Sequence, residues 1–426
     1  MAEWDPETDA AARERLPQLE RLFADALGAD GAVSGPFVLA SAPGRVEVAG
    51  NHVDHQGGRT ISAAIGERTW GLAAENGLAR IRVAMEGFGA AEIDLAAPDW
   101  AEPRPAEALA SAALVRGMAA AFAREGGALR GFDLVTVSDV PSGSGLSSSA
   151  AFEVMVGAAL QGLFGAGSTD AGGTAEVPLN PVAIALAATE AEQRYFGKPC
   201  GAQDQMACAC GGVIAIDFAP EVPVATPVPL RLADAGYAAV LVDSRQDHSL
   251  HQDEFAAIPA DMFRAARALG ARRLGDVPVQ ALLDALPALR DEAGDRCAMR
   301  ALHYYDEVRR VDAQRAALEA GDFQAFLAQV RLSGMSSAQF LQNVSVRGAG
   351  QELCQPVMVI QSLCAHVLGE RGAWRIHGGG FGGAVLVFVP ANEVLAFAAA
   401  MDGFLGYAAC RPVAIGGAGV RARRLA

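Results

Sequence analysis

The sequence predicts a two-domain α+β protein, and three features lead to that fold class. Its 426 residues exceed the roughly 250 to 300 at which a single hydrophobic core stops growing. Short β-branched stretches dominate the first part of the chain and long helical patterns the last part, without regular strand and helix alternation. A proline-rich passage, Ala219–Pro229, separates two strand-like segments and predicts a junction. We therefore expect domains over residues 1–225 and 226–426.

The first part of the chain combines an amphipathic start with strands and two helices. After the segment Asp9–Leu27, β-branched residues bounded by Gly, Pro and Asn predict short strands. They are expected at Phe37–Ala40, Arg45–Ala49, Thr60–Ile65, Thr69–Ala74 and Ile81–Met85. A helix, a strand, a Gly/Ser loop and a second helix follow at Ala106–Arg124, Phe132–Ser138, Pro141–Ser149 and Ala150–Phe164. The order of strand, glycine loop and helix suits a phosphate site.

The rest of the chain is mostly helical. The stretch Gly165–Val177 is rich in Gly, Ala and Thr and predicts a surface loop. A helix is expected over Pro181–Tyr195, because proline directly after an asparagine marks a helix start. Strand-like segments at Val213–Phe218 and Ala238–Val242 flank the predicted junction. Beyond it, the expected helices are Asp253–Leu269, Ala298–Ala320, Phe323–Asn343 and Glu352–Leu368, and the expected strand is Ala384–Val389.

Composition limits the partners of the chain. A formal charge of −15 disfavours surfaces that neutralise nucleic acid or dock on anionic lipid, so neither partner is expected. No run approaches the roughly 18 apolar residues that cross a bilayer, and Met1–Asp30 does not resemble a secretory signal. We therefore expect a cytoplasmic protein, with no obligate protein partner evident. The seven cysteines are scattered and odd in number, which indicates reduced thiols.

A loop of glycine and serine, Pro141 to Ala150, carries the clearest chemical signal. Glycine frees backbone amides to close on an anion, and the helix that starts near Ser148 directs its unpaired N–H groups to the same place. The alternative is a flexible linker, but the sequence that follows, Ala-Phe-Glu-Val-Met-Val, is not linker sequence. The residues expected to bind ATP phosphates are Ser142, Gly143, Ser144, Gly145, Leu146, Ser147, Ser148 and Ser149.

Such a phosphate site would work without a lysine in the loop. Lys198 is the only lysine of the chain, and no GxxxxGK[ST] sequence occurs, which excludes the P-loop mechanism. The absence of an HRD and DFG pair likewise excludes a protein-kinase site.

Three segments together resemble the galactokinase branch of the GHMP kinases. The first is Pro43-Gly44-Arg45-Val46-Glu47-Val48-Ala49-Gly50-Asn51-His52-Val53-Asp54-His55. The second is the glycine loop, through Gly-Leu-Ser-Ser-Ser-Ala, and the third is Ile376-His377-Gly378-Gly379-Gly380-Phe381-Gly382-Gly383. A fourth, Gly197-Lys198-Pro199-Cys200-Gly201-Ala202-Gln203-Asp204-Gln205, resembles the segment with the family's catalytic aspartate, although Gln203 replaces the usual Met. The segments follow the family's order and span most of the chain.

The resemblance implies a two-domain GHMP kinase fold with the active site in the cleft between the domains. Residues 1–225 would then hold the phosphate loop and the catalytic aspartate, and residues 226–426 would close over the cleft. The implied reaction transfers the γ-phosphate of ATP to the anomeric hydroxyl of galactose or a related hexose. The implied cofactors are ATP and Mg²⁺, and the implied partner is a small sugar.

Two catalytic residues are implied by the resemblance. Asp204 would accept or orient the proton of the sugar hydroxyl, and Arg45 would be the cation beside it. A nearby arginine keeps an aspartate ionised and offers a fixed positive fork to the transferring phosphoryl group. The sequence leaves open whether Asp204 is a base or a positioning group, because a loose phosphoryl-transfer transition state needs little deprotonation.

Metal and sugar ligands also follow from the resemblance. Magnesium takes few protein oxygen ligands, and here they would be Ser149 and Glu192; the alternative for Glu192 is a solvated helix position. The spacing of His52 and His55 lacks the carboxylate pattern that would favour zinc. The residues expected to bind the sugar are Asn51, His52, Asp54, Gly201, Asp204 and Phe255.

Two of these positions depart from the family. Galactokinases usually have Glu where this chain has Asn51, and Tyr where it has Phe255. Both changes alter which sugar substituents can be hydrogen-bonded, and unmatched buried polar groups discriminate strongly between substrates. The two changes would fit a hexose modified at C2 or C6, or one inside a disaccharide.

Three alternatives stay open at this point. Another GHMP branch would act on a non-sugar alcohol such as mevalonate or homoserine. A catalytically silent sugar sensor would keep the scaffold but is expected to lose the loop or the aspartate, and here Arg45, Asp204 and the loop are present. An esterase is suggested only by His377-Gly378-Gly379-Gly380, and no GxSxG nucleophile motif accompanies it.

Overall fold

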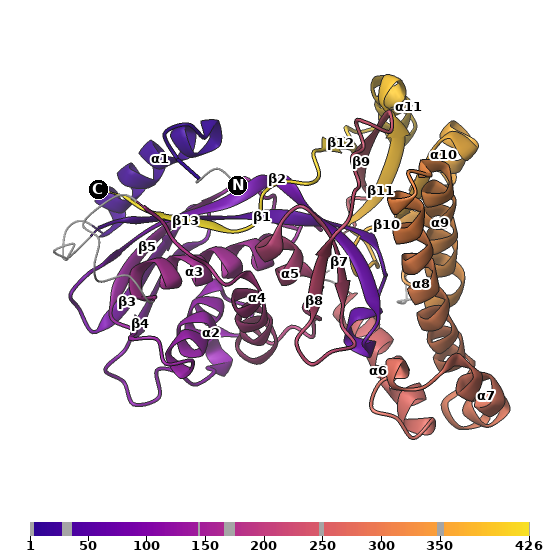
Figure 1. The fold of residues 1–426 in the computed structure, drawn as a ribbon, viewed down its shortest axis with the longest axis horizontal. Helices are drawn as coiled ribbons and strands as arrows, with labels where there is room; N and C mark the ends of the chain where they lie inside the picture. The colour runs from indigo at the N-terminus through magenta and orange to yellow at the C-terminus, as the bar shows by residue number, and fades with distance from the viewer. Residues whose placement is uncertain are drawn as a thin grey trace.

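The computed structural model describes residues 4–27, 36–143, 145–165, 175–246, 251–346 and 353–425. Its strands form two separate sheets, and helices pack against both, which confirms the α+β class (Figure 1). Figure 1 shows a broad first part, indigo to magenta, beside a mostly helical second part, orange to yellow. The predicted junction, Ala219–Pro229, contains a strand of the larger sheet, Val224–Pro227, and the first strand of the smaller sheet begins after it at Tyr237.

The larger sheet has the strand order β4-β3-β5-β2-β1-β13-β6, with β7 paired to β2 and β8 paired to β7. The long strand β2 joins the two parts of this sheet, because residues 69–75 pair with β5 and residues 59–63 pair with β7. The strands are β1 (Val38–Ala49), β2 (Arg59–Glu75), β3 (Arg80–Met85), β4 (Gly89–Asp94), β5 (Phe132–Ser138), β6 (Ala175–Glu176), β7 (Val213–Asp217), β8 (Val224–Pro227) and β13 (Arg421–Arg424).

The two longest strands each replace two predicted short ones. In β1 the pairing register with β2 shifts between Pro43 and Arg45, and again between Glu47 and Ala49. Such bulges bend a strand without ending it, which is why the Pro43-Gly44 pair does not break β1. At this bend the chain approaches the glycine loop so closely that a Cβ on Gly44 would lie 2.7 Å from the carbonyl oxygen of Leu146. The position predicted as a break in β1 is thus a bend in a continuous strand, where the chain contacts the glycine loop.

Helices cover both faces of the larger sheet (Figure 1). On one face α3 (Ser148–Phe164) packs against β1 and β2 and is surrounded by α2 (Ser111–Arg124), α4 (Pro181–Glu190) and α5 (Gln203–Cys210). Because α3 is enclosed by sheet and helices, nearly its whole length is apolar and buried. The amphipathic helix α1 (Ala10–Leu27) packs on the opposite face. The burial of α3 fixes the position of the glycine loop that precedes it.

The second part of the structure is built on a smaller sheet of order β10-β11-β9-β12. Its strands are β9 (Tyr237–Asp243), β10 (Ala373–Ile376), β11 (Ala384–Pro390) and β12 (Cys410–Val413). The helices of this part are α6 (Gln252–Ala268), α7 (Val279–Ala293), α8 (Asp295–Glu319), α9 (Phe323–Ser336), α10 (Pro356–Leu368) and α11 (Val394–Leu405). Helix α8 packs against α9 and also reaches β2, so it connects the two parts. The final strand, β13, returns to the larger sheet, and the boundary after residue 225 stays a prediction.

Two predicted helices continue as π-helical turns. Helix α4 is followed by η3 (Ala191–Phe196), and α9 is followed by η6 (Ser337–Leu341). Such turns are rare and often lie at functional sites. The helices α5, α7 and α11 were not predicted, because they are short or interrupted by proline or small residues. Most of the loop predicted at Gly165–Val177 lies outside the described residues, as does Glu352 at the start of a predicted helix.

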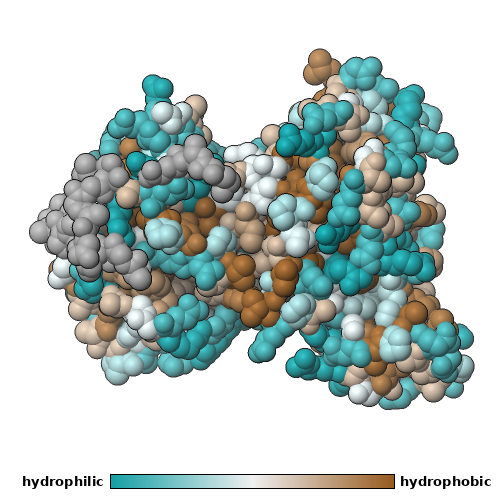
Figure 2. Space-filling view, viewed as in Figure 1, coloured by the Kyte–Doolittle hydropathy of each residue, from teal (hydrophilic) through white to brown (hydrophobic). Residues whose placement is uncertain are grey.

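The surface of the face shown in Figure 2 is mixed, with hydrophilic residues over much of both parts and hydrophobic residues gathered near the waist between them. Among the helices that the structure describes, none has both the length and the apolar composition needed to cross a membrane.

Candidate active site

Arg45 and Asp204 form a bidentate ion pair at the centre of the site. Arg45 lies on β1 and is 5% exposed, while Asp204 is the second residue of α5. The Nε and Nη2 groups of Arg45 donate to the two carboxylate oxygens of Asp204, each at 2.7 Å. Burial alone would raise the pKa of Asp204, but the charge and hydrogen bonds of Arg45 outweigh it and hold the pKa at about 2. Asp204 is therefore ionised at neutral pH.

The glycine loop closes on the same pair. Ser147 has a left-handed backbone with φ 59°, and its hydroxyl donates to Oδ2 of Asp204 at 2.6 Å. Arg45 holds the loop from the other side, since its guanidinium donates to the carbonyl of Gly145 and its backbone N–H donates to the carbonyl of Leu146 at 3.1 Å. No side chain caps the start of α3, so its first N–H groups are left for an anion. The loop thus places Asp204 beside the uncapped start of α3.

The predicted loop residues do not all have the same environment. Leu146 is 0% exposed and packs in the core, so only its backbone faces the site. Ser142 and Gly143 are exposed, and Ser148 is half-buried at the first position of α3. Ser144 lies outside the described residues. Direct phosphate contacts at these positions stay predictions.

A second polar cluster lies at the first turn of α3. The hydroxyl of Ser149 donates to Oε1 of Glu192 at 2.9 Å, and the ammonium group of Lys198 lies 2.9 Å from the same oxygen. Gln205, next to Asp204, donates to the other oxygen of Glu192 at 2.7 Å. The π-helical turn η3 therefore directs Glu192 toward α3, not toward solvent as the alternative interpretation supposed.

The chemistry of this cluster fits magnesium. Ser149 and Glu192 offer hard oxygen donors, as Mg²⁺ prefers. Glu153 lies one helical turn after Ser149, and its Oε1 is buried without a partner among the described residues. Burial and the neighbouring charge of Glu192 raise the pKa of Glu153 well above its usual range. The described residues contain no group of three or more His, Cys, Asp or Glu side chains placed to hold a metal, so nucleotide phosphates and waters would complete the shell.

Residues predicted to bind the sugar line the other side of the ion pair. Gly201 packs so closely on Asp54 that a Cβ there would lie 1.6 Å from Oδ2 of that carboxylate. Asp54 also lies close enough to Asp204 to be affected by its charge. Burial and the Asp204 charge raise the pKa of Asp54, and the nearby His52 lowers it in part. Only glycine at position 201 leaves Asp54 in this place.

His52 and Phe255 form an adjoining wall. Nε2 of His52 donates to the carbonyl of Gly379 at 2.9 Å, and burial lowers the pKa of His52 to about 4. The rings of His52 and Phe255 lie 5.3 Å apart, and Phe255 packs directly on Gly379. The C-terminal glycine motif therefore meets the predicted sugar residues, and His52 stays neutral at physiological pH.

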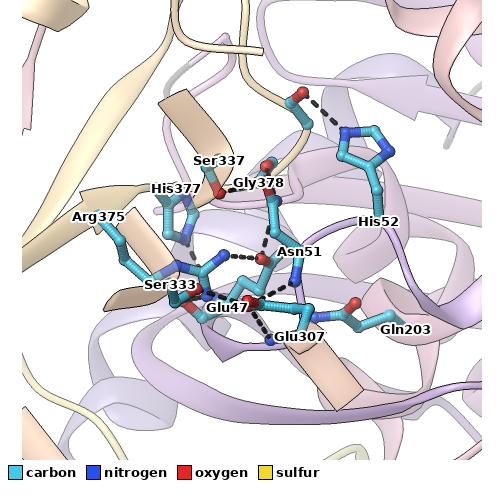
Figure 3. Close-up of polar contacts among 12 residues, drawn as sticks. Glu47, Asn51, His52, Gln203, Glu307, Ser333, Ser337, Arg375, His377 and Gly378 are labelled. Carbon is cyan, nitrogen blue, oxygen red and sulfur yellow. Dashed lines mark hydrogen bonds and ion pairs between the residues drawn. The ribbon is translucent and has the colours of Figure 1, made fainter. Parts of the chain in front are cut away.

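Asn51 is turned away from this wall, into the interior (Figure 3). Its amide nitrogen donates to Oε1 of Glu47 at 3.0 Å and to the carbonyl of Gly378 at 2.8 Å. Its amide oxygen accepts from Ser337 at 3.1 Å and from Asn343 at 2.8 Å. All four hydrogen-bonding positions of the amide are occupied, so none is left for a sugar in this structure. The sugar-binding role of Asn51 stays a prediction without support from this geometry.

Further buried residues surround the backbone of Asn51. Glu307, on α8, accepts hydrogen bonds from the N–H groups of Gly50 and Asn51 at 3.3 and 3.4 Å. His303, also on α8, donates to the carbonyl of Asn51 at 3.0 Å. Arg375 on β10 forms a buried ion pair with Glu47. This network joins the end of β1 to α8 and β10 (Figure 3).

Sequence reasoning missed most of this network. Glu47, Lys198, Gln205 and His377 lay inside quoted motifs without an assigned role. The missed residues between 303 and 343 lay inside helical patterns that indicated only packing, and Arg375 lay outside every predicted element. Buried charged residues at helical spacing, such as His303 and Glu307, were a possible signal, because ionisable side chains are rarely buried without a partner. The residues missed are Glu47, Lys198, Gln205, His303, Glu307, Ser333, Ser337, Asn343, Arg375 and His377.

Two known protein families match the segments of the chain that contain Arg45 and Asp204. Residues 22–75 match the galactokinase galactose-binding signature, and residues 113–212 match the GHMP kinases N terminal domain. A galactokinase from Streptomyces coelicolor is 31% identical over 370 residues, which cover 86% of this chain and 88% of that protein.

Solved structures share the fold. The crystal structure of Lactococcus lactis galactokinase complexed with galactose superposes with a TM-score of 0.77 at 24% identity, covering 95% of this chain and 99% of that chain. The structure of L. major mevalonate kinase in complex with R-mevalonate gives a TM-score of 0.60 at 17% identity, covering 91% and 99%.

The Asn51 network yields a stability prediction. Asn51→Asp removes both amide donors and places a second carboxylate beside buried Glu47, so we expect the free energy of unfolding to fall by about 3 kcal/mol. Denaturant titration measures this loss, and Asn392→Asp on the surface is the matched control.

A second substitution tests the cause of that loss. Adding Glu47→Gln to Asn51→Asp again gives the pair one carboxylate and one amide. The double variant should therefore lose less free energy of unfolding than the sum of the two single losses. An Asn51→Asp protein as stable as the wild type would contradict the importance of these four buried hydrogen bonds for stability.

Proposed function

This chain belongs to the galactokinase family of GHMP kinases, and from that membership we propose that it transfers the γ-phosphate of ATP to the anomeric hydroxyl of galactose. The observation that carries the proposal is the ionised Asp204, held by Arg45 and Ser147 beside the glycine loop. A carboxylate beside the glycine loop can orient a hydroxyl for in-line attack on a terminal phosphate.

Each catalytic group has one part in this proposal. Asp204 orients the sugar hydroxyl and accepts its proton late in the transfer, because a carboxylate of pKa about 2 is a weak base. Arg45 keeps Asp204 ionised and faces the charge that develops on the phosphoryl oxygens. The backbone of the loop and the start of α3 hold the phosphates. Mg²⁺, when bound with ATP, neutralises phosphate charge, and Ser149 and Glu192 would hold it.

The sugar is proposed to lie against Asp54, Gly201 and His52. Asp54 offers acceptor oxygens near Asp204, and it can lie there only because position 201 is glycine. Because the Asn51 amide is saturated inside the protein, its difference from the usual Glu gives no reason to expect a modified hexose. Galactose is therefore the first candidate. Phe255, which packs beside His52, is the position where the choice of sugar would differ from that of galactokinases with tyrosine there.

The open alternatives have less support. A silent sensor has no need of an ionised carboxylate paired with arginine beside the phosphate loop, yet this chain keeps both. The likeness to a mevalonate kinase concerns the fold alone.

A coupled assay of ADP release tests the proposed function. The purified protein is given ATP and Mg²⁺ with galactose, other hexoses, N-acetylhexosamines, deoxysugars and small disaccharides, together with mevalonate and homoserine. We expect galactose to give the largest kcat/KM. Turnover of mevalonate or homoserine without turnover of any sugar would replace the proposal with another GHMP branch, and ATP binding without any turnover would favour a sensor.

Removal of the central carboxylate should abolish transfer but not nucleotide binding. Asp204→Ala is expected to lower kcat by about 10³-fold or more, because the sugar hydroxyl loses its orienting acceptor. Calorimetry with ATP should give an affinity close to that of the wild type. Asp234→Ala, an exposed aspartate far along the chain, controls for general loss of charge. Near-normal turnover of Asp204→Ala would overturn this mechanism.

Magnesium binding should depend on Glu192. Glu192→Gln is expected to raise the Mn²⁺ or Mg²⁺ concentration for half-saturation by about tenfold or more, because a charged oxygen ligand becomes neutral. Mn²⁺ binding followed by electron paramagnetic resonance, with nucleotide present, measures this directly. Glu190→Gln, which removes a surface pair with Arg124, is the matched control. Equal metal affinity in both variants would exclude Glu192 as a ligand.

A further inference from the structure

His377 is a buried histidine with no assigned role at the start of the C-terminal glycine motif. It follows β10 directly and is 2% exposed. Its Nε2 accepts a hydrogen bond from the backbone N–H of Glu47 at 3.2 Å. The ring is therefore fixed on β1, at the residue two positions after Arg45.

This hydrogen bond determines the tautomer. A neutral imidazole that accepts at Nε2 carries its proton on Nδ1. Burial, with the adjacent charges of Arg45 and Arg375, lowers the pKa of His377 well below its usual range, so the ring is neutral. The Nδ1–H group is buried and has no hydrogen-bond partner among the residues that the structure describes. An unpaired buried donor is costly and is rare without a functional reason.

The free N–H group faces the phosphate loop. A Cβ on Gly145 would lie 3.2 Å from Nδ1 of His377, and the backbone of Gly145 has φ 78°. Since glycine has no Cβ, that space next to Nδ1 is not filled by a side chain. The carbonyl of Gly145 is already bound by Arg45, and a Cβ on Gly378 would lie 3.8 Å from Nη2 of the same arginine. The donor therefore points to the loop on the side where Arg45 lies.

An anion is the acceptor that this arrangement suits. Arg45 supplies positive charge at the same place, and a neutral N–H donor adds to it without repulsion. The nearest anion implied by the loop is the phosphate end of a nucleotide.

We propose that the Nδ1–H group of His377 donates a hydrogen bond to the terminal phosphate of the bound nucleotide and is thereby a further catalytic residue. The inference rests on the proposed kinase function. No proton is transferred, because the N–H only donates to an oxygen whose charge changes as the phosphoryl group moves to the sugar. The C-terminal glycine motif would thus contact the phosphate directly, in addition to covering the sugar wall.

Two substitutions separate the two nitrogens of the ring. His377→Gln can place an amide oxygen near the Nε2 position, where it accepts from Glu47, but leaves no donor near the Nδ1 position. His377→Asn can place an amide N–H near the Nδ1 position but does not reach Glu47. The first variant should therefore keep the contact that fixes the motif and lose the proposed phosphate contact, and the second should do the reverse.

Calorimetry with two nucleotides provides the test. His377→Gln is expected to bind adenylyl imidodiphosphate about ten- to a hundredfold more weakly than the wild type, while its affinity for ADP stays the same. His377→Asn should keep more of the analogue affinity than His377→Gln, even where it is less stable. In ¹⁵N-histidine spectra of the wild type, the Nδ1–H signal of His377 should move with the analogue and not with ADP.

The outcomes separate this inference from the proposed function. Equal affinity of His377→Gln and the wild type for the analogue would overturn the proposed phosphate contact. The Nδ1–H group would then be assigned a hydrogen bond to a buried water instead. Equal losses for ADP and the analogue would also overturn it, because they indicate a purely structural role. A wild-type protein that binds the analogue but phosphorylates no sugar would contradict the proposed function and leave the phosphate contact of His377 to be judged by the binding data.

Discussion

The ion pair between Arg45 and Asp204 is the interaction on which the site depends. Partial burial between a loop, a strand and a helix raises the pKa of the Asp204 carboxylate, and a fixed positive charge against it lowers that pKa again. Arg45 provides that charge through two hydrogen bonds and at the same time binds the backbone of the glycine loop. One arginine therefore keeps Asp204 ionised and holds the glycine loop in place.

Strand β1 also connects the Arg45–Asp204 pair to the smaller sheet. Arg45 and Glu47 are two residues apart on the strand, the spacing at which side chains share a face. Glu47 pairs with Arg375 on β10, its N–H binds His377, and Asn51 follows at the end of the strand. Arg45 and the contacts with the smaller sheet thus lie on one short stretch of chain. We infer that the alignment of the two parts is fixed close to the chemistry.

Much of the fold and the centre of the site could be predicted from the sequence, because local patterns and short motifs determine them. Period and turn signals located β5, α3 and β11, and the motif resemblance brought together Arg45, Asp204 and the loop. Local patterns did not reveal that Pro43-Gly44 is a bulge within one strand, since only the partner strand and Leu146 explain it. They also did not reveal the inward position of Asn51, because its four partners come from distant segments.

The most direct test of the account is ³¹P nuclear magnetic resonance of a reaction with ATP, Mg²⁺ and galactose. The account predicts a new phosphate signal coupled to the anomeric proton of the sugar, formed by the wild type and absent with Asp204→Ala. A phosphate signal on another hydroxyl, an anomeric phosphate that still forms with Asp204→Ala, or only free phosphate from ATP hydrolysis would contradict it.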